Sequence, residues 1–190
     1  MNRLILAVLC IFVVSGNAFG DEIDDIRAEY TQYGLKVPDR AMFGTSHPSI
    51  YFSNSEMGNP NDDYEYFLAN HVFWDFMDNL RNQTGEIIVI SSGYRSPSYN
   101  RSLVDEHGRR IAHDNSLHQY GAGTDATKFG PNYWVNMTES QKDELFVQIG
   151  VAATVMQGTY GDRFYIEAKE KSDHLHFELM DYCHFDDNWL

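Results

Sequence analysis

The residue types best suited to chemistry gather in two segments of this chain. His174 and His176 lie two positions apart in an alternating stretch, so a strand there would place both imidazoles on one face. His118 and Asp125 precede them in a glycine-containing segment. Two imidazoles and one carboxylate form a ligand set that zinc accepts when a fourth position stays open for catalysis. The spacing alone also suits histidines that are only surface-exposed or hydrogen-bonded, so it leaves both interpretations open.

An arginine follows the most apolar strand pattern of the chain. Residues 86–92 form a short β-branched run, which predicts a buried central strand, and Arg95 comes directly after it between Gly93 and Pro97. An arginine on a stiff turn at a sheet edge can line a cleft, where its guanidinium would bind a carboxylate or an oxyanion. It can equally well tie down a carboxylate of a neighbouring loop. The residues alone favour neither role.

Three short motifs follow one another in this part of the chain. They are S-G-Y-R-S at residues 92–96, S-x-H-x-x-G-x-G-x-D at residues 116–125 and D-H-x-H at residues 173–176. Their types and order resemble the zinc D-Ala-D-Ala carboxypeptidase family, which includes vancomycin-resistance-type peptidases and phage endolysin peptidases. The Hedgehog signalling domain shares the fold of that family. One departure is Gly123, where the family usually has alanine.

The resemblance implies a role for each matching residue. The zinc ligands would be His118, Asp125 and His176. The other implied roles are Asp173 as general base, His174 as a histidine that hydrogen-bonds near the metal, Arg95 as the group that steadies the substrate carbonyl and its oxyanion, and Ser116 and Tyr94 as residues beside the substrate. Glycines 121 and 123 would permit a tight turn that lets the first two ligands converge.

The function implied by the resemblance is that of a secreted zinc metallopeptidase. It would hydrolyse peptidoglycan stem peptides, or muropeptides, at D-Ala-D-Ala or a neighbouring bond, through a water activated by Zn²⁺. An alternative is a non-catalytic zinc-containing binding module of Hedgehog-like fold. The presence of Asp173, paired histidines and Arg95 favours catalysis, because a purely structural zinc site is normally closed by a fourth ligand. Cleavage elsewhere in the wall, such as at L-Ala–D-Glu, fits the sequence equally well.

Composition and charge limit the other function classes. The chain has 190 residues, of which 43% are hydrophobic and 22% charged, values typical of one globular domain. Its 28 acidic and 14 basic residues give a formal net charge of −14. Nucleic-acid binding requires a basic surface that displaces counterions from the phosphates. We therefore expect no nucleic-acid partner.

The first twenty residues have the layout of a secretory signal peptide. Arg3 precedes an apolar run over residues 4–14, and Ala18 and Gly20 stand at the small-residue positions before a cleavage site. The apolar run is too short to cross a membrane as a helix. Cleavage would remove one arginine and no acidic residue, which changes the net charge from −14 to −15, and would leave Cys183 as the one cysteine. We expect a secreted or periplasmic monomer without an internal disulfide and without membrane contact.

The predicted elements indicate an α+β fold, because helices come first and strands cluster later. We expect a small antiparallel sheet flanked by helices, as in a Hedgehog/D-Ala-D-Ala peptidase-like fold. The patterns predict helices over residues 22–33, 62–85, 98–106 and 138–157, a short strand over 49–52, and strands over 86–92, 125–129, 163–168 and 174–180. The predicted organisation is a signal peptide over residues 1–20, an N-terminal helix and irregular arm over 21–62, and a zinc peptidase domain over 63–190 that is compact with the arm.

Residues 101–115 separate the first two motifs and have no counterpart in the family pattern. We interpret them as a loop at the mouth of the cleft, with His107 and His113 as solvated histidines rather than extra ligands. Glu178 shares the strand face of the paired histidines, where it would either orient a metal ligand or be exposed. Structural roles are expected for the remaining histidines, His47, His71 and His184, with His71 on the apolar face of the 62–85 helix.

Overall fold

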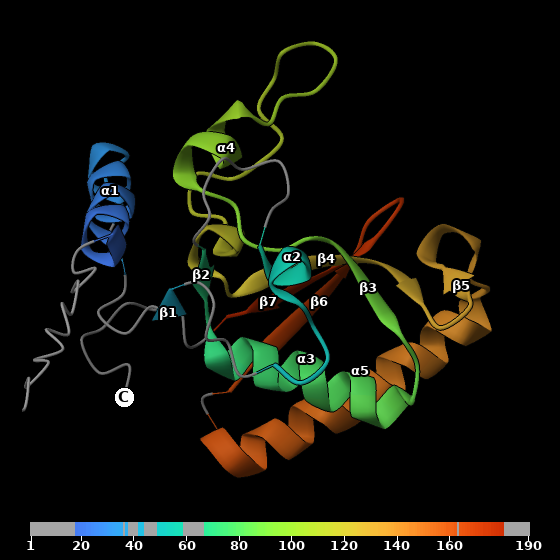
Figure 1. The fold of residues 1–190 in the computed structure, drawn as a ribbon. Helices are drawn as coiled ribbons and strands as arrows, with labels where there is room; N and C mark the ends of the chain where they lie inside the picture. The colour runs from blue at the N-terminus through green and yellow to red at the C-terminus, as the bar shows by residue number, and fades with distance from the viewer. Residues whose placement is uncertain are drawn as a thin grey trace, which may run out of the picture.

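The computed structural model describes residues 18–35, 37, 42–43, 49–58, 67–162 and 164–180. It contains helices and a small antiparallel sheet, so the predicted α+β class is confirmed (Figure 1). The predicted signal segment up to residue 17, both cysteines, His47 and His184 lie outside the described residues.

Helices and strands are interspersed along the described part of the chain. The helices are α1 (Ala18–Gln32), α2 (Asn54–Met57), α3 (His71–Thr84), α4 (Pro97–Ser102) and α5 (Glu139–Tyr160), together with the short 3₁₀ helices η2 (Leu117–Tyr120) and η3 (Trp134–Asn136). The strands are β1 (Met42–Phe43), β2 (Leu68–Ala69), β3 (Ile88–Ser92), β4 (Gly123–Phe129), β5 (Asn132–Tyr133), β6 (Ile166–Glu170) and β7 (Leu175–Leu179).

The main sheet has the strand order β3-β4-β7-β6, and β5 pairs with the end of β4. All of its pairings are antiparallel, and β6 and β7, which correspond to the strands predicted over residues 163–168 and 174–180, form a hairpin. The prediction that residues 86–92 form a central strand is wrong, because β3 lies at one end of this order. Ile88 and Ile90 are buried whereas Ile87 and Val89 are exposed, so the β-branched run has only one face in the core.

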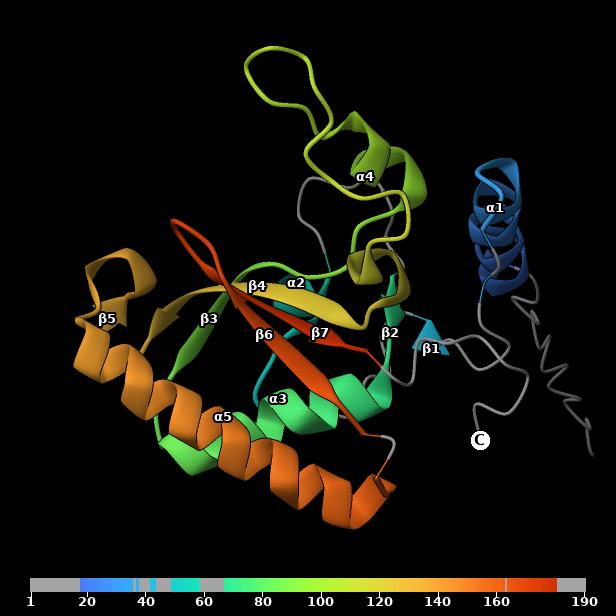
Figure 2. The ribbon, with the colours of Figure 1, turned by 180° about the vertical axis from the view of Figure 1, so that it is seen from behind.

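Helices α3 and α5 cover one face of the sheet, as the two opposite views show (Figures 1 and 2). Phe76 of α3 packs against Phe177 of β7 and against Phe164, with ring centroids 6.1 and 6.0 Å apart. The alternate residues Leu175, Phe177 and Leu179 of β7 are fully buried on this side. Burial of large apolar side chains stabilises the sheet–helix layer. The residues between them, including His176, therefore project from the opposite face.

Helix α3 begins later than the apolar pattern predicts. Asn70 is its N-cap and its side chain accepts a hydrogen bond from the Phe73 backbone N–H at 3.1 Å. This cap satisfies a backbone donor of the first turn, so the helix starts at His71, while Leu68–Ala69 form β2. His71 is exposed on the first turn, so its expected place on the apolar face is wrong. The helix ends at Gly85 as predicted, in the left-handed conformation.

Two further local predictions differ from the structure. Residues 49–52 form a turn rather than a strand, because Asp78 accepts hydrogen bonds from the Ser49 hydroxyl and the Ile50 N–H at 2.7 and 2.9 Å. Helix α4 begins at Pro97 but ends at Ser102, and the chain then forms a protruding loop closed by a bridge between Val104 and Arg110 (Figure 2).

Helix α5 begins with a capping box at the predicted start of the helix. The Thr138 side chain accepts from the Gln141 N–H, and the Gln141 side chain accepts from the Thr138 N–H at 2.9 Å. The helix ends at Tyr160, a little beyond the predicted end. Within the described part of the chain, no helix has the length and apolar character needed to cross a membrane.

Candidate metal centre

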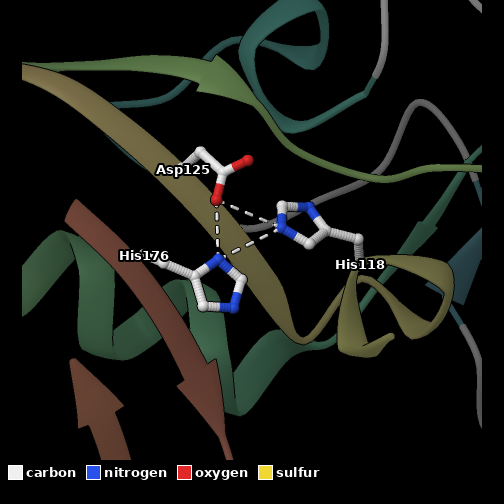
Figure 3. A group of neighbouring side chains, drawn as sticks. All are labelled: His118, Asp125 and His176. Carbon is white, nitrogen blue, oxygen red and sulfur yellow. Dashed lines mark hydrogen bonds and ion pairs between the residues drawn. The ribbon is translucent and has the colours of Figure 1, made fainter. Parts of the chain in front are cut away.

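Three elements bring His118, Asp125 and His176 together on the side of the sheet opposite to α3 and α5 (Figure 3). His118 lies on η2, Asp125 on β4 and His176 on β7. Asp125 Oδ1 is 2.6 Å from His176 Nδ1 and 3.3 Å from His118 Nε2, and the two imidazole nitrogens are 3.4 Å apart. One donor atom from each residue lies within 4.8 Å of the other two, so this cluster could hold a metal ion.

The backbone explains why these residues meet. Asp125 and His176 are direct partners in the antiparallel register of β4 and β7. Gly121 turns the chain from η2 into β4 with a φ of +62°, and a Cβ there would lie 2.1 Å from the Leu68 carbonyl oxygen. Only glycine combines that conformation with so close an approach. Gly123 does not have a positive φ but lies tightly against His118, since a Cβ on Gly123 would be 3.1 Å from the backbone nitrogen of His118.

Each histidine of the cluster is oriented by a hydrogen bond on its other nitrogen. His118 Nδ1 donates to the Gly93 carbonyl oxygen at 2.6 Å, which leaves Nε2 facing Asp125. His176 Nε2 lies 2.9 Å from Glu178 Oε1, and Lys169 holds the other Glu178 oxygen at 3.0 Å. Such partners fix the ring orientation and the tautomer of metal-binding histidines. Glu178 therefore contacts a candidate ligand, the first of its two predicted alternatives.

The electrostatics of the cluster favour a cation. Burial lowers the pKa of the His118 imidazole, against the opposing effect of the Asp125 carboxylate, so His118 is neutral near pH 7. Burial alone would raise the pKa of the Asp125 carboxyl, but the adjoining imidazoles of His118 and His176 and the Arg95 guanidinium hold that pKa far below its usual range. Burial likewise opposes charge on His176, yet hydrogen bonds to Asp125 and Glu178 raise its pKa above 6.5. A metal ion would take the place of the proton on His176 Nδ1.

Arg95 lies behind the cluster. Its Nη2 donates to Asp125 Oδ2, and its Nε donates to the Ser92 hydroxyl at 2.9 Å. One carboxylate oxygen of Asp125 thus accepts a hydrogen bond from Arg95, and the other faces the two histidines. The sequence left two roles open for Arg95, binding a substrate anion or binding a carboxylate of the protein. In the structure, Arg95 binds a carboxylate of the protein, that of Asp125.

Asp173 and His174 lie beside the cluster at the start of β7. His174 Nδ1 is 2.8 Å from Asp173 Oδ1, and His174 Nε2 is 3.4 Å from Asp125 Oδ1. The Asp173 side chain is 75% exposed, whereas that of His174 is 23% exposed. The histidine therefore faces the site, and the aspartate contacts it from the solvent side.

The cluster opens into a cavity of about 1240 Å³. Ser116, His113 and His174 contribute to its wall, as do apolar residues of the protruding loop such as Leu103 and Ile111. The loop predicted at the mouth of the cleft is thus part of the cavity wall. His107 and His113 are both exposed, and neither belongs to the donor cluster found among the described residues.

Tyr94 does not lie in the cavity wall. It is 1% exposed, and its hydroxyl shares a hydrogen bond with the Tyr30 hydroxyl at 3.2 Å. The same Tyr30 hydroxyl contacts the Gln119 carbonyl oxygen, one residue after His118. The structure therefore gives Tyr94 no surface for a substrate and places it beneath η2.

Sequence reasoning missed several residues that support the site. Tyr30 falls within the helix predicted over residues 22–33, and nothing in the sequence indicates that it contacts η2. Lys169 and Lys171 line the cavity beside the cluster. The two-residue alternation of the strand predicted over residues 163–168 continues through both lysines. This alternation was the one sequence signal that could have placed them on the face of the sheet that carries His176.

Comparisons with protein-family models, with curated proteins and with solved structures each found no match. The resemblance of the three motifs to the D-Ala-D-Ala peptidase family stays a prediction.

Proposed function

We propose that this protein is a zinc metallopeptidase that hydrolyses peptidoglycan stem peptides at D-Ala-D-Ala or a neighbouring bond. The observation that carries the proposal is the donor set of buried His118, buried Asp125 and partly buried His176 in the wall of a cavity. Two imidazoles and one carboxylate match the ligands of catalytic zinc sites, which keep one position open. The motif order in the sequence supports the choice of peptidase class.

The donor set fits zinc in its chemistry as well as in its spacing. His118 Nε2, His176 Nδ1 and one Asp125 oxygen would hold the ion, and each histidine has a hydrogen-bond partner on its remaining nitrogen. When bound, zinc lowers the pKa of water and polarises the substrate carbonyl.

The proton-transfer group that faces the site is His174. Within the proposal, His174 Nε2 accepts a proton from the attacking water and returns it to the leaving amine, while Asp173 holds the Nδ1–H of the ring. This arrangement differs from the general-base role that the family resemblance implies for Asp173. Arg95 acts by fixing Asp125 through its second oxygen.

A peptide substrate suits the size and lining of the cavity. A volume of about 1240 Å³ exceeds what a small ligand needs, and the wall combines polar groups near the cluster with apolar side chains such as Leu35 and Ile111. A secreted or periplasmic location, predicted from the first twenty residues, would place the enzyme where the cell wall lies.

A second candidate function is a non-catalytic zinc-containing binding module. One observation favours it: Arg95 is already bound to Asp125, and Asp173 lies on the solvent side of His174. Two groups that the family uses in catalysis are then not directed at a substrate.

Hydrolysis of defined muropeptides separates the two functions. The zinc-loaded chain is incubated with stem peptides ending in D-Ala-D-Ala, and the products are identified by mass. The variant is His118→Ala, and the matched control is His107→Ala, a histidine exposed on the protruding loop. The peptidase proposal expects loss of one D-Ala or cleavage at a neighbouring bond by the native chain and by the control only. Zinc binding without hydrolysis of any stem-peptide bond would favour the binding module.

A further inference from the structure

The N-terminal helix α1 packs against α4 and η2, and it lies apart from α5 in both ribbon views (Figures 1 and 2). The Glu29 carboxylate accepts a hydrogen bond from the Ser98 N–H at 2.7 Å, in the first turn of α4. The next residue, Tyr30, is fully buried, and its ring meets the Tyr120 ring of η2 edge-on with the centroids 6.1 Å apart. Helix α1 is therefore docked on the elements around the metal cluster.

The Tyr30 hydroxyl joins two of these elements. It donates to the Gln119 carbonyl oxygen in η2 and shares a hydrogen bond with the Tyr94 hydroxyl at 3.2 Å. Burial raises the pKa of the Tyr30 phenol well above 10, so the hydroxyl keeps its proton at neutral pH. One side chain of α1 thus connects η2 to the turn that follows β3.

The first of the two elements, η2, carries a candidate ligand. His118 directly precedes Gln119, so the hydrogen bond from Tyr30 lies one residue away from that ligand. The helix is a 3₁₀ helix of only four residues. Such helices have poor internal hydrogen-bond geometry, so a contact from outside adds to their rigidity. The position of His118 therefore depends in part on the Tyr30 hydroxyl.

The second element, the turn after β3, holds the partners of two candidate ligands. Tyr94 stands between Gly93 and Arg95. The Gly93 carbonyl oxygen is 2.6 Å from His118 Nδ1, and the Arg95 guanidinium donates to Asp125. A shift of this turn against η2 would disturb both contacts.

We infer that Tyr30 is a positioning residue of the metal centre, because its hydroxyl fixes η2 against the turn after β3 and so sets the place of His118. The inference rests on the zinc site of the proposed function and adds the N-terminal helix to it. A functional site needs its groups held within about 0.5 Å of the productive geometry, and the residues around the ligands provide that precision. Tyr30 acts through the backbone of η2.

The test compares Tyr30→Phe, which keeps the ring and loses the hydroxyl, with the native chain. Tyr94→Phe removes the other hydroxyl of the pair and is the second variant. Tyr33→Phe is the matched control, because it makes the same change on the same helix at a ring that lies under Arg101. Ile149→Val lowers stability from α5, on the other face of the sheet, and controls for stability.

Three measurements are made on every chain. A competition titration with a chelator gives the zinc affinity. The visible absorption of the Co²⁺-substituted chain reports the geometry of the ligands. Urea unfolding gives the stability, which a purely structural tyrosine would change without changing either metal measurement.

Tyr30→Phe should bind zinc about tenfold more weakly, at the lower end of the range for groups that orient ligands. Its Co²⁺ spectrum should differ from the native one, because His118 moves. Tyr94→Phe should show a smaller change of the same kind, whereas both controls should match the native chain in both metal measurements. Native affinity and a native Co²⁺ spectrum in Tyr30→Phe would overturn the inference. An equal loss of affinity in Ile149→Val would also overturn it, since affinity would then follow stability alone.

Hydrolysis of stem peptides by the same samples tests the proposed peptidase separately. Zinc binding that depends on Tyr30, without hydrolysis, contradicts the peptidase and leaves the role of Tyr30 intact. Hydrolysis by the native chain and by Tyr30→Phe with equal zinc affinities contradicts the role of Tyr30 alone. A folded native chain that binds no zinc contradicts both.

Discussion

Asp125 and His176 face each other across β4 and β7, with 2.6 Å between Asp125 Oδ1 and His176 Nδ1. Because the two residues are register partners, their approach follows from backbone pairing and needs no long loop. The third donor, His118, depends on a single glycine turn. Two of the three donors are therefore positioned by strand pairing, as a site that must hold a fixed geometry requires.

Replacing Glu178 by glutamine tests how His176 is oriented. The His176 hydrogen bond lowers the pKa of the Glu178 carboxyl to about 2, so a charged acceptor would be lost from that ring. We expect zinc affinity to fall by about 10–100-fold, the range usual for such partners. A competition titration with a zinc chelator measures it. Glu167→Gln, which touches Lys169 but not the histidine, is the control. Equal affinities for both variants would contradict the role of Glu178.

Replacing Arg95 by methionine separates the two roles of this arginine. If Arg95 fixes Asp125, as the geometry indicates, the variant should bind zinc about tenfold more weakly, because Asp125 loses the partner of its Oδ2. The same chelator titration detects this change. Unchanged zinc affinity with a loss of turnover would instead place Arg95 on the substrate.

Substitutions of His174 and Asp173 should lower kcat by different factors. General acid–base groups contribute about 10²–10⁴-fold to a rate, so His174→Asn should lower kcat by at least about 100-fold with zinc still bound. Asp173→Asn should lower it less, since the exposed aspartate only holds the ring. Single-turnover rates on a stem peptide give both values. A larger effect of Asp173→Asn would return the base role to the aspartate.

The stability of the zinc-free protein should pass through a maximum with pH. The folded-state pKa of Glu178 is lowered from 4.5 to about 2, so its contribution is present above pH 4.5 and is lost as the pH falls toward 2. The pKa of His176 is raised above 6.5, so its contribution is complete below that pH and is lost as the pH rises through the raised value. Urea unfolding across this range should give the highest free energy of unfolding between about pH 4.5 and 6.5. In Glu178→Gln, the free energy of unfolding should fall less as the pH drops below 4.5. An unchanged fall in this variant would argue against the Glu178–His176 pair.

Alanine at Gly121 should be far more damaging than alanine at Gly108. Both glycines have a positive φ, of 62° and 75°, but only at Gly121 would a Cβ overlap a backbone oxygen. Gly108→Ala carries the conformational cost of about 1 kcal/mol, whereas Gly121→Ala should exceed about 2 kcal/mol and displace His118. Urea unfolding and zinc titration of the two variants measure this difference. Similar losses in both would show that the close approach to Leu68 is not needed.

The sequence predicted the donor cluster better than it predicted its surroundings. Periodicity placed His174 and His176 on one strand face, and the glycines around His118 indicated a turn. The contact between Asp125 and His176, however, depends on which strands are neighbours. A β-branched run does not reveal its place in a sheet, which is why β3 was expected at the centre and lies at an end.

Contacts between distant segments were beyond sequence reasoning for the same reason. The hydrogen bond of Tyr30 to the Gln119 carbonyl joins α1 to η2. The sequence around either residue gives no sign of this contact. Helix α3 started later than its apolar pattern because a single Asn70 cap prevails over the periodicity of the residues before it. Local patterns predict elements, whereas the tertiary partners decide where those elements end and what they touch.

The zinc content of the untagged chain, purified in parallel with His118→Ala, tests the central claim most directly. After zinc is offered and the excess removed, we predict about one zinc per native chain and none above background in the variant, because three donors meet at one point. A folded native protein that retains no zinc, or a variant that retains as much as the native chain, would contradict the metal centre and the peptidase built on it.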